Sequence, residues 1–279
     1  MTDRFPAGPT RAIDRSTAYY SPGLDIEAWF AVADRDYLEL IEALDWEALF
    51  GSFGGGVELL DVGCGTGRFP ELLATTGTLP DLPIRYDYLD PSAHSLKELR
   101  RGLASPFVPR TGFHATVEDF SPSEYPKGSY DVVWSIHSLY AAATSELPYT
   151  IAKLRGLLRA PEGRCLIYIA EPDAFYIRFY ELYREHVAPR PGAFTNADDV
   201  RREIMSQGLK HDEVTLEFRH DIADSNHALL GEYLSKCAFD RRSTAAWLGQ
   251  GEIRDFLTQF QGEDGYVFPQ RVTLFSFGP

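Results

Sequence analysis

Three glycines at alternate positions, with a carboxylate just before them, stand in one short stretch and could hold a nucleotide. Residues 57–69 read Val-Glu-Leu-Leu-Asp-Val-Gly-Cys-Gly-Thr-Gly-Arg-Phe. The aliphatic half of this run is typical of a buried parallel strand, and Gly63, Gly65 and Gly67 let the next residues turn sharply against a ligand. A helix is expected over residues 70–76, which begin with a proline. Such a strand, turn and helix form a nucleotide pocket.

The spacing of the glycines and the charge beside them indicate which nucleotide. A dinucleotide fingerprint has a third glycine where this chain has Arg68, and a long side chain there opposes close packing of helix and strand. Asp61 would repel a pyrophosphate, but its carboxylate can accept hydrogen bonds from a cationic, amino-bearing ligand. We therefore predict a pocket for S-adenosylmethionine and disfavour a nicotinamide dehydrogenase.

An acidic residue ends the next predicted strand, over residues 84–90. Asp90 follows Gly63 by 27 residues, which is roughly the offset of an acid that binds ribose hydroxyls. Capping of the following helix by Asp90, Pro91 and Ser92 is the simpler explanation. With the glycine turn upstream we favour the ribose role for Asp90, with Pro91 beside it.

A third strand is expected over residues 113–117, followed by two more acids. An adenine slot needs an apolar wall and an acceptor near the exocyclic amine. We assign Val117 to the wall and Glu118 to the amine, with Asp119 as the second candidate. An acidic residue in a solvent-exposed loop would give the same sequence pattern.

The fourth predicted strand, residues 129–140, runs into a polar turn. In a doubly wound sheet the ligand lies beyond the carboxyl ends of the strands, so residues 135–140 should face the reacting group. Ile136 and His137 are expected to contact the cofactor. His137 is also the natural base for a proton that leaves an acceptor, because an unperturbed imidazole titrates near neutrality. A hydrogen-bonding spacer is the simpler role for this histidine.

These segments, in this order, resemble the class I S-adenosylmethionine-dependent methyltransferases. Residues 60–67, Leu-Asp-Val-Gly-Cys-Gly-Thr-Gly, resemble the first motif of that family, and Tyr-Asp-Val-Val at residues 130–133 resembles the fourth. The resemblance covers residues 55–172 and the last two strands. It implies an α/β, doubly wound, Rossmann-like sheet of seven mostly parallel strands, with S-adenosylmethionine as the cofactor and a small-molecule acceptor.

A weaker resemblance links the chain to histamine N-methyltransferase and related small-amine enzymes. It implies that Tyr140 is an aromatic wall at the reaction centre, that Asp34 or Asp36 is an N-terminal acid for the amine, and that Gln270 is a last-strand amide. His137 stands where that family has an amide, and Ala141 where it has a second aromatic residue. The most favoured acceptor is an amine or imidazole nitrogen, although histamine itself is not indicated.

Three further residues are predicted to contact the substrate. Tyr20 stands in a tyrosine pair before a Pro-Gly turn, although such residues often only pack an N-terminal arm. Glu171 ends the fifth strand, where helix capping is the other explanation. Tyr176 belongs to an aromatic helix at residues 175–183, and such spacing is more often ordinary core.

The remaining elements are predicted to place these residues in three regions. Residues 1–52 form an N-terminal arm and a helical cap, residues 53–172 form the cofactor-binding core, and residues 173–279 contain lid helices and the last two core strands. Within them we predict helices at residues 25–50, 148–159, 196–207 and 226–260, and strands at residues 165–170, 211–220 and 267–277. The length of the last insertion suggests a substrate lid.

Composition limits the other function classes. The 279 residues carry a formal charge of −14 with 44% apolar content, which supports a full core and disfavours nucleic acid as a partner. No long apolar stretch or N-terminal hydrophobic segment suggests membrane insertion or secretion, so a cytoplasmic protein is expected. The three cysteines are widely spaced and the histidines form no ligand pair, so no metal site is predicted. Oligomeric state is not readable from the sequence.

Two other functions use the same predicted pocket. An O-methyltransferase of a natural-product pathway would keep the core and change only the residues around the acceptor. A catalytically silent S-adenosylmethionine-binding module would keep the pocket without turnover.

Overall fold

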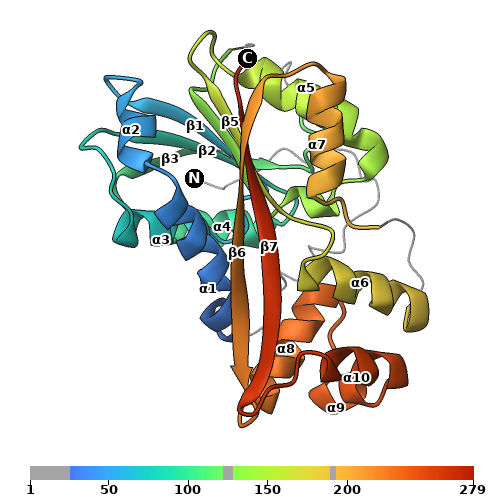
Figure 1. Cartoon of the computed structure of the whole chain (residues 1–279). Helices are drawn as coiled ribbons and strands as arrows, with labels where there is room; N and C mark the ends of the chain where they lie inside the picture. The colour runs from blue at the N-terminus through green and yellow to red at the C-terminus, as the bar shows by residue number, and fades with distance from the viewer. Residues whose placement is uncertain (1–25, 122–127, 189–192) are drawn as a thin grey trace.

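The computed structural model describes residues 26–121, 128–188 and 193–279. Within these residues, seven strands form one sheet in the order β3-β2-β1-β4-β5-β7-β6 (Figure 1). β7 is antiparallel to both of its neighbours, and the remaining pairs are parallel. The predicted doubly wound, mostly parallel sheet is confirmed.

The bounds of the elements are as follows. The strands are β1 Val57–Val62, β2 Ile84–Asp90, β3 Phe107–His114, β4 Val132–Ile136, β5 Arg164–Ala170, β6 His211–Ala223 and β7 Gly265–Phe277. The α-helices are α1 Ile26–Ala43, α2 Trp46–Gly51, α3 Arg68–Thr76, α4 Ala93–Gly102, α5 Leu147–Leu157, α6 Phe175–His186, α7 Ala197–Ser206, α8 His227–Ala238, α9 Thr244–Leu248 and α10 Gly251–Thr258.

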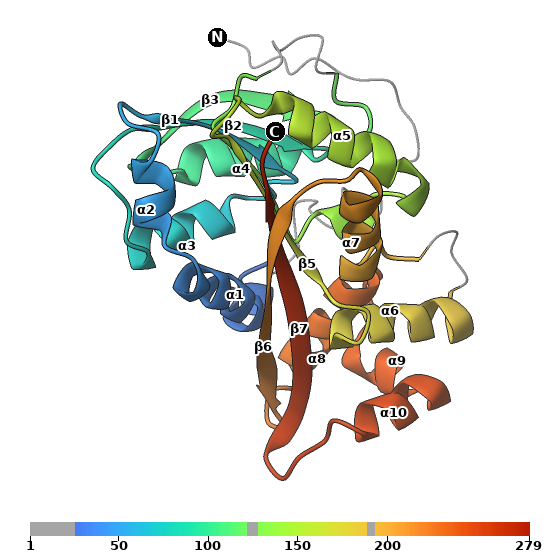
Figure 2. The same cartoon turned by 45° about the horizontal axis from the view of Figure 1, so that its top comes forward.

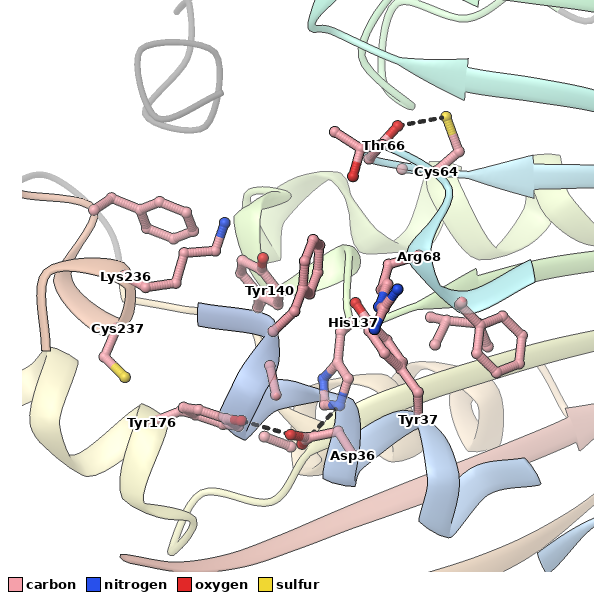
Figure 3. Close-up of a pocket in the computed structure, with 18 of the residues that line it drawn as sticks. Asp36, Tyr37, Cys64, Thr66, Arg68, His137, Tyr140, Tyr176, Lys236 and Cys237 are labelled. Carbon is pink, nitrogen blue, oxygen red and sulfur yellow. Dashed lines mark hydrogen bonds and ion pairs between the residues drawn. The ribbon is translucent and has the colours of Figure 1, made fainter. Parts of the chain in front are cut away.

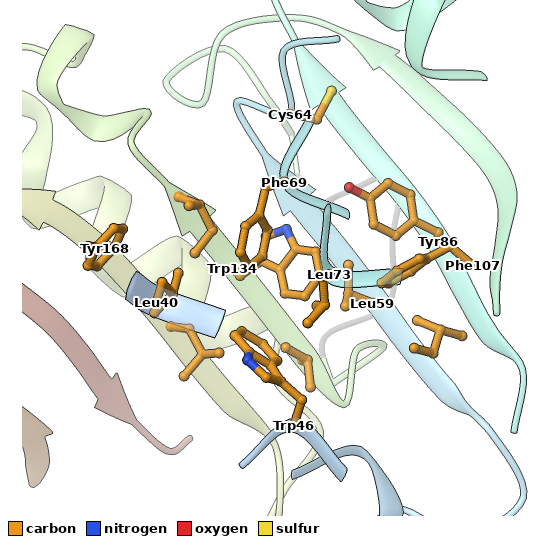
Figure 4. Packing of buried hydrophobic residues seen from close by; sticks show 14 of the residues in the cluster. Leu40, Trp46, Leu59, Cys64, Phe69, Leu73, Tyr86, Phe107, Trp134 and Tyr168 are labelled. Carbon is orange, nitrogen blue, oxygen red and sulfur yellow. The ribbon is translucent and has the colours of Figure 1, made fainter. Parts of the chain in front are cut away.

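The central strands are apolar on both faces because helices cover both faces of the sheet. Helices α1–α4 pack on one face, and α5 and α7 pack on the other (Figures 1 and 2). Successive residues of a strand point to opposite faces, so Leu59 enters the first core and Leu60 the second. Trp134 of β4 lies at the centre of the first core, 5.2 Å from Phe69 and 6.1 Å from Trp46 between ring centroids (Figure 4). The glycine turn therefore follows a strand that is packed into the core on both faces.

The third strand was predicted at the wrong residues. β3 spans Phe107–His114 rather than 113–117, and it contains Pro109 and Gly112, which read as breakers in the sequence. β3 is an edge strand, where a proline without an N–H group is tolerated because one side of the strand is unpaired. Most of the other predicted elements agree with the structure to within three residues at their ends.

The hairpin of β6 and β7 extends well past the rest of the sheet. Its two strands pair over 13 residues each, whereas the pairing of β5 with β7 stops at Ala170 and Val272. α1 packs against β6, and α6 and α8 lie beside the free part of the hairpin (Figure 1). These helices, with α9 and α10, enclose a third, aromatic core that includes Phe175 and Phe268, whose ring centroids are 4.1 Å apart.

No helix in the described residues is long and apolar enough to cross a lipid bilayer.

Candidate active site

A cavity opens at the carboxyl ends of β1 and β4. α1, α6 and α8 close it from the side of the free hairpin, and Figure 3 shows the side chains that project into it. Aromatic side chains make up much of the wall: Phe30, Tyr37, Phe69, Tyr140, Tyr176, Phe194 and Phe239. The predicted turn at the end of the first strand and the predicted polar turn after the fourth strand therefore meet in one cavity.

The glycine turn is shaped by backbone conformations that favour glycine. Gly63, Gly65 and Gly67 have φ of 74°, 53° and 86°, in the left-handed region where a Cβ is unfavourable. A Cβ at Gly63 would lie 2.2 Å from the Cβ of Ser138. The Ser138 hydroxyl donates to the carbonyl of Val62 at 2.6 Å. This contact holds the β4 turn, including Ile136 and His137, directly against the glycine turn.

Asp90 joins the glycine turn to the end of β2. One carboxylate oxygen accepts from the Gly65 amide at 3.0 Å, and the other accepts from the Ser92 amide at 2.7 Å. The helix cap itself is Ser92, whose hydroxyl accepts from Ser95. Pro91 does not line the cavity, and its carbonyl oxygen lies 2.8 Å from Nε2 of His114.

Asp61 brings a buried carboxylate to the cavity wall. It is 3% exposed and accepts a hydrogen bond from the hydroxyl of Tyr86. Burial, helped by the nearby charge of Asp90, raises the pKa of Asp61 to about 7. Burial disfavours the ionised form of this carboxyl group, so a cationic partner, which stabilises the ionised form, binds there favourably. This environment suits the ammonium group of an amino-acid-bearing ligand.

The raised pKa of Asp61 predicts a pH-dependent affinity for a ligand that carries an ammonium group. A bound ammonium lowers the pKa of Asp61, so affinity is highest above pH 7 and falls as Asp61 becomes protonated. Between pH 8 and pH 6 we expect S-adenosylhomocysteine, which keeps the amino-acid group, to bind roughly tenfold more weakly, as measured by calorimetry. In Asp61→Asn this pH dependence should disappear, whereas Asp81→Asn, at an exposed position, should retain it. An equal affinity of the natural protein at both pH values would contradict the role of Asp61.

In the cavity wall, three side chains converge on the carboxylate of Asp36. Nε2 of His137 lies 3.1 Å from one oxygen, and Nε2 of His220 lies 2.8 Å from the other. The Tyr176 hydroxyl donates to the second oxygen at 2.8 Å (Figure 3). Burial opposes ionisation of Asp36, but the two imidazoles outweigh it and hold the pKa of this carboxyl well below its usual range. Asp36 is therefore ionised, and both of its carboxylate oxygens already have partners within the protein.

The contacts continue from Asp36 into the free hairpin. Nδ1 of His220 lies 2.9 Å from the Tyr233 hydroxyl, and Nε2 of Gln270 donates to that hydroxyl at 3.0 Å. Since Gln270 supplies the donor, the Tyr233 hydroxyl can donate to Nδ1 of His220, which leaves Nε2–H of His220 for Asp36. Gln270 is thus placed two side chains away from Asp36 and not in the cavity wall.

His137 is held so that one of its ring nitrogens is available to a ligand. Its φ of 50° is unusual for a residue with a side chain, and such conformations concentrate at functional sites. Nε2 faces Asp36, and Nδ1 has no hydrogen-bond partner among the residues that the structure describes. The Asp36 carboxylate favours the tautomer with the proton on Nε2, so the Nδ1 lone pair is left for a proton acceptor role.

The second predicted N-terminal acid has a different partner. Asp34 forms a two-pronged ion pair with Arg68, with Nε of Arg68 at 2.9 Å from one carboxylate oxygen and Nη2 at 2.5 Å from the other. Because Arg68 begins α3 directly after the glycine turn, this pair fastens α1 to that turn. The arginine that departs from the dinucleotide fingerprint thus positions the cap, and Asp34 does not line the cavity.

The other predicted site residues are divided between the cavity and its surroundings. Tyr140 and Tyr176 line the cavity, and burial raises the pKa of both hydroxyls, so they remain protonated. Glu171 lies outside the cavity wall, where Arg201 donates to it at 2.7 Å, so a substrate contact by Glu171 conflicts with the structure. Tyr20 lies outside the described residues.

The predicted adenine slot lies beyond the cavity wall, in the turn after β3. The carbonyls of Val117 and Glu118 both accept from Nζ of Lys153, at 2.7 and 2.8 Å. These contacts fix the backbone of the turn, and the roles of the two side chains toward adenine stay predictions.

Several cavity residues were not anticipated from the sequence. Tyr37 follows Asp36 on α1, and burial keeps its hydroxyl protonated by raising its pKa. Lys236 and Cys237 enter the cavity from α8. A lysine within the apolar run Tyr-Leu-Ser-Lys-Cys-Ala-Phe was the one available signal, because lysine is rarely buried without a purpose. The described residues contain no cluster suited to a metal ion.

Comparison with known proteins agrees with this geometry. Residues 59–163, which hold the glycine turn, Asp61, Asp90 and His137, match the family described as "Methyltransferase domain". Residues 59–163 are a methyltransferase domain. The predicted cofactor of such a domain is S-adenosylmethionine, and the raised pKa of Asp61 fits its ammonium group.

Two curated relatives are similar to part of this chain. Nocamycin O-methyltransferase of Saccharothrix syringae is 38% identical over 113 residues, which are 39% of this chain and 36% of the relative. The non-reducing polyketide synthase SAT8 of Stachybotrys chartarum is 28% identical over 149 residues, 52% of this chain and 5% of the synthase. The chain thus spans about a third or less of the length of these relatives.

A solved structure supports the methyltransferase fold over nearly the whole chain. Magnesium protoporphyrin IX methyltransferase (ChlM) from Synechocystis PCC 6803, solved with bound SAH, is similar with a TM-score of 0.51 at 14% identity. The match covers 94% of this chain and 97% of the other. At this identity the likeness describes the fold and not the acceptor.

Proposed function

We propose that this methyltransferase transfers a methyl group to a hydroxyl oxygen of a small aromatic or enolic molecule, with His137 as the general base. The observation that carries the proposal is the pairing of Asp36 with Nε2 of His137, a cavity-lining residue whose Nδ1 is not used in that pairing. The aromatic walls suit a flat acceptor, because aromatic rings stack on one another in enclosed sites. The curated relative that is a nocamycin O-methyltransferase supports an oxygen acceptor.

In the proposed mechanism the chain aligns the acceptor and removes one proton. S-adenosylmethionine supplies an electrophilic methyl group on a sulfonium. The glycine turn and the β4 turn are joined through Ser138 and would hold the cofactor next to His137. The aromatic walls exclude water. The acceptor oxygen would gain its bond to the methyl carbon as the carbon–sulfur bond breaks and a neutral thioether leaves, and the hydroxyl proton passes to Nδ1 of His137. Asp36 stabilises the imidazolium that forms.

The predicted nitrogen acceptor is the second candidate. Its support is the weaker resemblance to histamine N-methyltransferase-like enzymes, which stays a prediction. The resemblance implies an N-terminal acid that anchors an amine-bearing acceptor, and both predicted N-terminal acids are engaged. Asp34 is paired with Arg68, and Asp36 is in contact with two histidines and Tyr176. This engagement is why we favour oxygen.

Matched acceptors test the choice. Purified protein is incubated with S-adenosylmethionine and either 2-naphthol or 2-naphthylamine, which differ only in the reacting atom, and methylated products are measured by mass spectrometry. We expect the O-methyl product and little N-methyl product. Methylation of the amine alone would support the second candidate. Binding of S-adenosylmethionine without any product over a wider panel of phenols, enols and amines would favour the catalytically silent module.

A further inference from the structure

His220 is a buried histidine that the proposed mechanism does not use. It lies on β6 in the free part of the hairpin, is 1% exposed and does not line the cavity. Its Nε2 lies 2.8 Å from a carboxylate oxygen of Asp36, and its Nδ1 lies 2.9 Å from the Tyr233 hydroxyl. A buried ring with a polar partner at each nitrogen is held in one orientation. His220 therefore cannot touch a ligand in the cavity, but it can act on one through Asp36.

The polar groups that face His220 come from three helices. They are the carboxylate of Asp36 on α1, the hydroxyl of Tyr176 on α6 and the hydroxyl of Tyr233 on α8. The ring of Tyr233 also packs edge-on against the imidazole, with ring centroids 5.6 Å apart. β6 is paired with β7 along its whole length, so the backbone that carries His220 is fixed as well. The position of the imidazole is thus set by the strand and by the helices around it.

The carboxylate of Asp36 is shared between two imidazoles. One oxygen lies 3.1 Å from Nε2 of His137, and the other lies 2.8 Å from Nε2 of His220. The two oxygens belong to one rigid group, so a contact that fixes one of them also fixes the direction of the other. His220 lies on a paired strand, whereas His137 lies in the turn after β4. His220 is therefore the fixed end of this arrangement, and His137 is the end that it orients.

We propose that His220 is a positioning residue for the general base: it holds the carboxylate of Asp36 so that His137 keeps its proton on Nε2 and leaves Nδ1 to the acceptor. This inference rests on the proposed role of His137 and adds the residue that keeps the base in one tautomer. The hydrogen bond at one ring nitrogen of a histidine decides which nitrogen carries the proton. Without His220 the carboxylate can turn away from His137, and the tautomer with the proton on Nδ1 becomes populated. That tautomer cannot take a proton at Nδ1.

Nitrogen NMR of the histidine side chains tests the proposal without an acceptor. The spectra are recorded on the full chain at a pH at which the imidazoles are neutral, and His137→Asn identifies the signals of His137. The natural protein should show His137 in a single tautomer with the proton on Nε2. His220→Phe, which keeps an aromatic ring but removes both nitrogens, should give a mixture of the two tautomers. His220→Gln, whose amide can still donate to Asp36, should keep the single tautomer.

Kinetics separate positioning from a general loss of structure. His220→Phe should lower kcat with 2-naphthol by roughly 10–100-fold and leave KM for S-adenosylmethionine nearly unchanged, since misplacing a catalytic group by about 1 Å can cost about 10²-fold. His220→Gln should recover most of the rate. In the His137→Asn background, His220→Phe should have little further effect, because the group that it positions is already gone. His211→Phe, on the same strand and outside the cavity wall, is the matched control and should keep the natural rate.

Three results would overturn the proposal. These are a natural protein in which His137 is not in the Nε2–H tautomer, a tautomer that is unchanged in His220→Phe, and a loss of rate that is equally large in the His137→Asn background. Absence of any O-methyl product would instead refute the proposed function, and the spectra would still decide whether His220 fixes His137. If thermal unfolding shows that His220→Phe is not folded, His220→Asn takes its place, because its shorter amide can contact Tyr233 but does not reach Asp36.

Discussion

Replacing His137 by asparagine is expected to lower kcat by roughly 10²–10⁴-fold, because a positioned general base typically contributes that much. Asparagine is the sharpest substitution because it tolerates the left-handed backbone that His137 adopts, with φ of 50°. It also keeps a hydrogen-bonding side chain next to Asp36. The variant therefore removes the proton acceptor with little change to the turn.

The affinity for the cofactor should change much less than the rate. The Ser138 hydroxyl holds the β4 turn against the glycine turn through Val62, and that contact does not involve the imidazole. Initial rates at saturating 2-naphthol and calorimetry with S-adenosylhomocysteine separate the two quantities. His186→Gln, on the part-exposed end of α6, is the matched control and should retain the natural rate.

The same variant distinguishes the two candidate acceptors. The histamine N-methyltransferase-like family, which the sequence resembles weakly, has an amide at the position of His137. An unchanged kcat with 2-naphthol in His137→Asn would refute the base. A rate that is lost with the phenol and retained with an amine would show that the proton of the hydroxyl is what His137 accepts.

The residues expected to bind the cofactor were predictable because they lie in two short sequence segments. The glycines, Asp61 and Asp90 follow directly from the ends of two apolar strands, and neighbouring parallel strands bring their carboxyl ends together. The pattern could not show that Asp90 also accepts from Gly65, because that contact depends on the exact path of the turn.

The acceptor side was only partly predictable. Asp34 and Asp36 are two residues apart on a helix, so their side chains point in nearly opposite directions. Spacing alone cannot say which one faces inward, and the structure gives Asp34 to Arg68 and Asp36 to His137. His220 was read only as part of a strand, because the length of the free hairpin, which carries it to Asp36, is not written in any local motif.

Replacing Asp90 by alanine is expected to weaken binding of S-adenosylhomocysteine by roughly 10²–10⁴-fold, since two hydrogen bonds to a charged group are lost together. Part of this loss would come from the turn itself, because Asp90 also holds the amides of Gly65 and Ser92. Calorimetry measures the total, and thermal unfolding measures the effect on stability. Asp81→Ala, at an exposed position before β2, is the matched control.

A second ligand separates the ribose contact from the effect on the turn. Adenosine and 2′,3′-dideoxyadenosine differ only in the two hydroxyls that Asp90 is proposed to bind. The natural protein should prefer adenosine, and Asp90→Ala should bind the two equally, because the coupling between the carboxylate and the hydroxyls is then gone. If the variant keeps the full preference for adenosine, the ribose contact lies elsewhere, and the role of Asp90 is confined to the amides of Gly65 and Ser92.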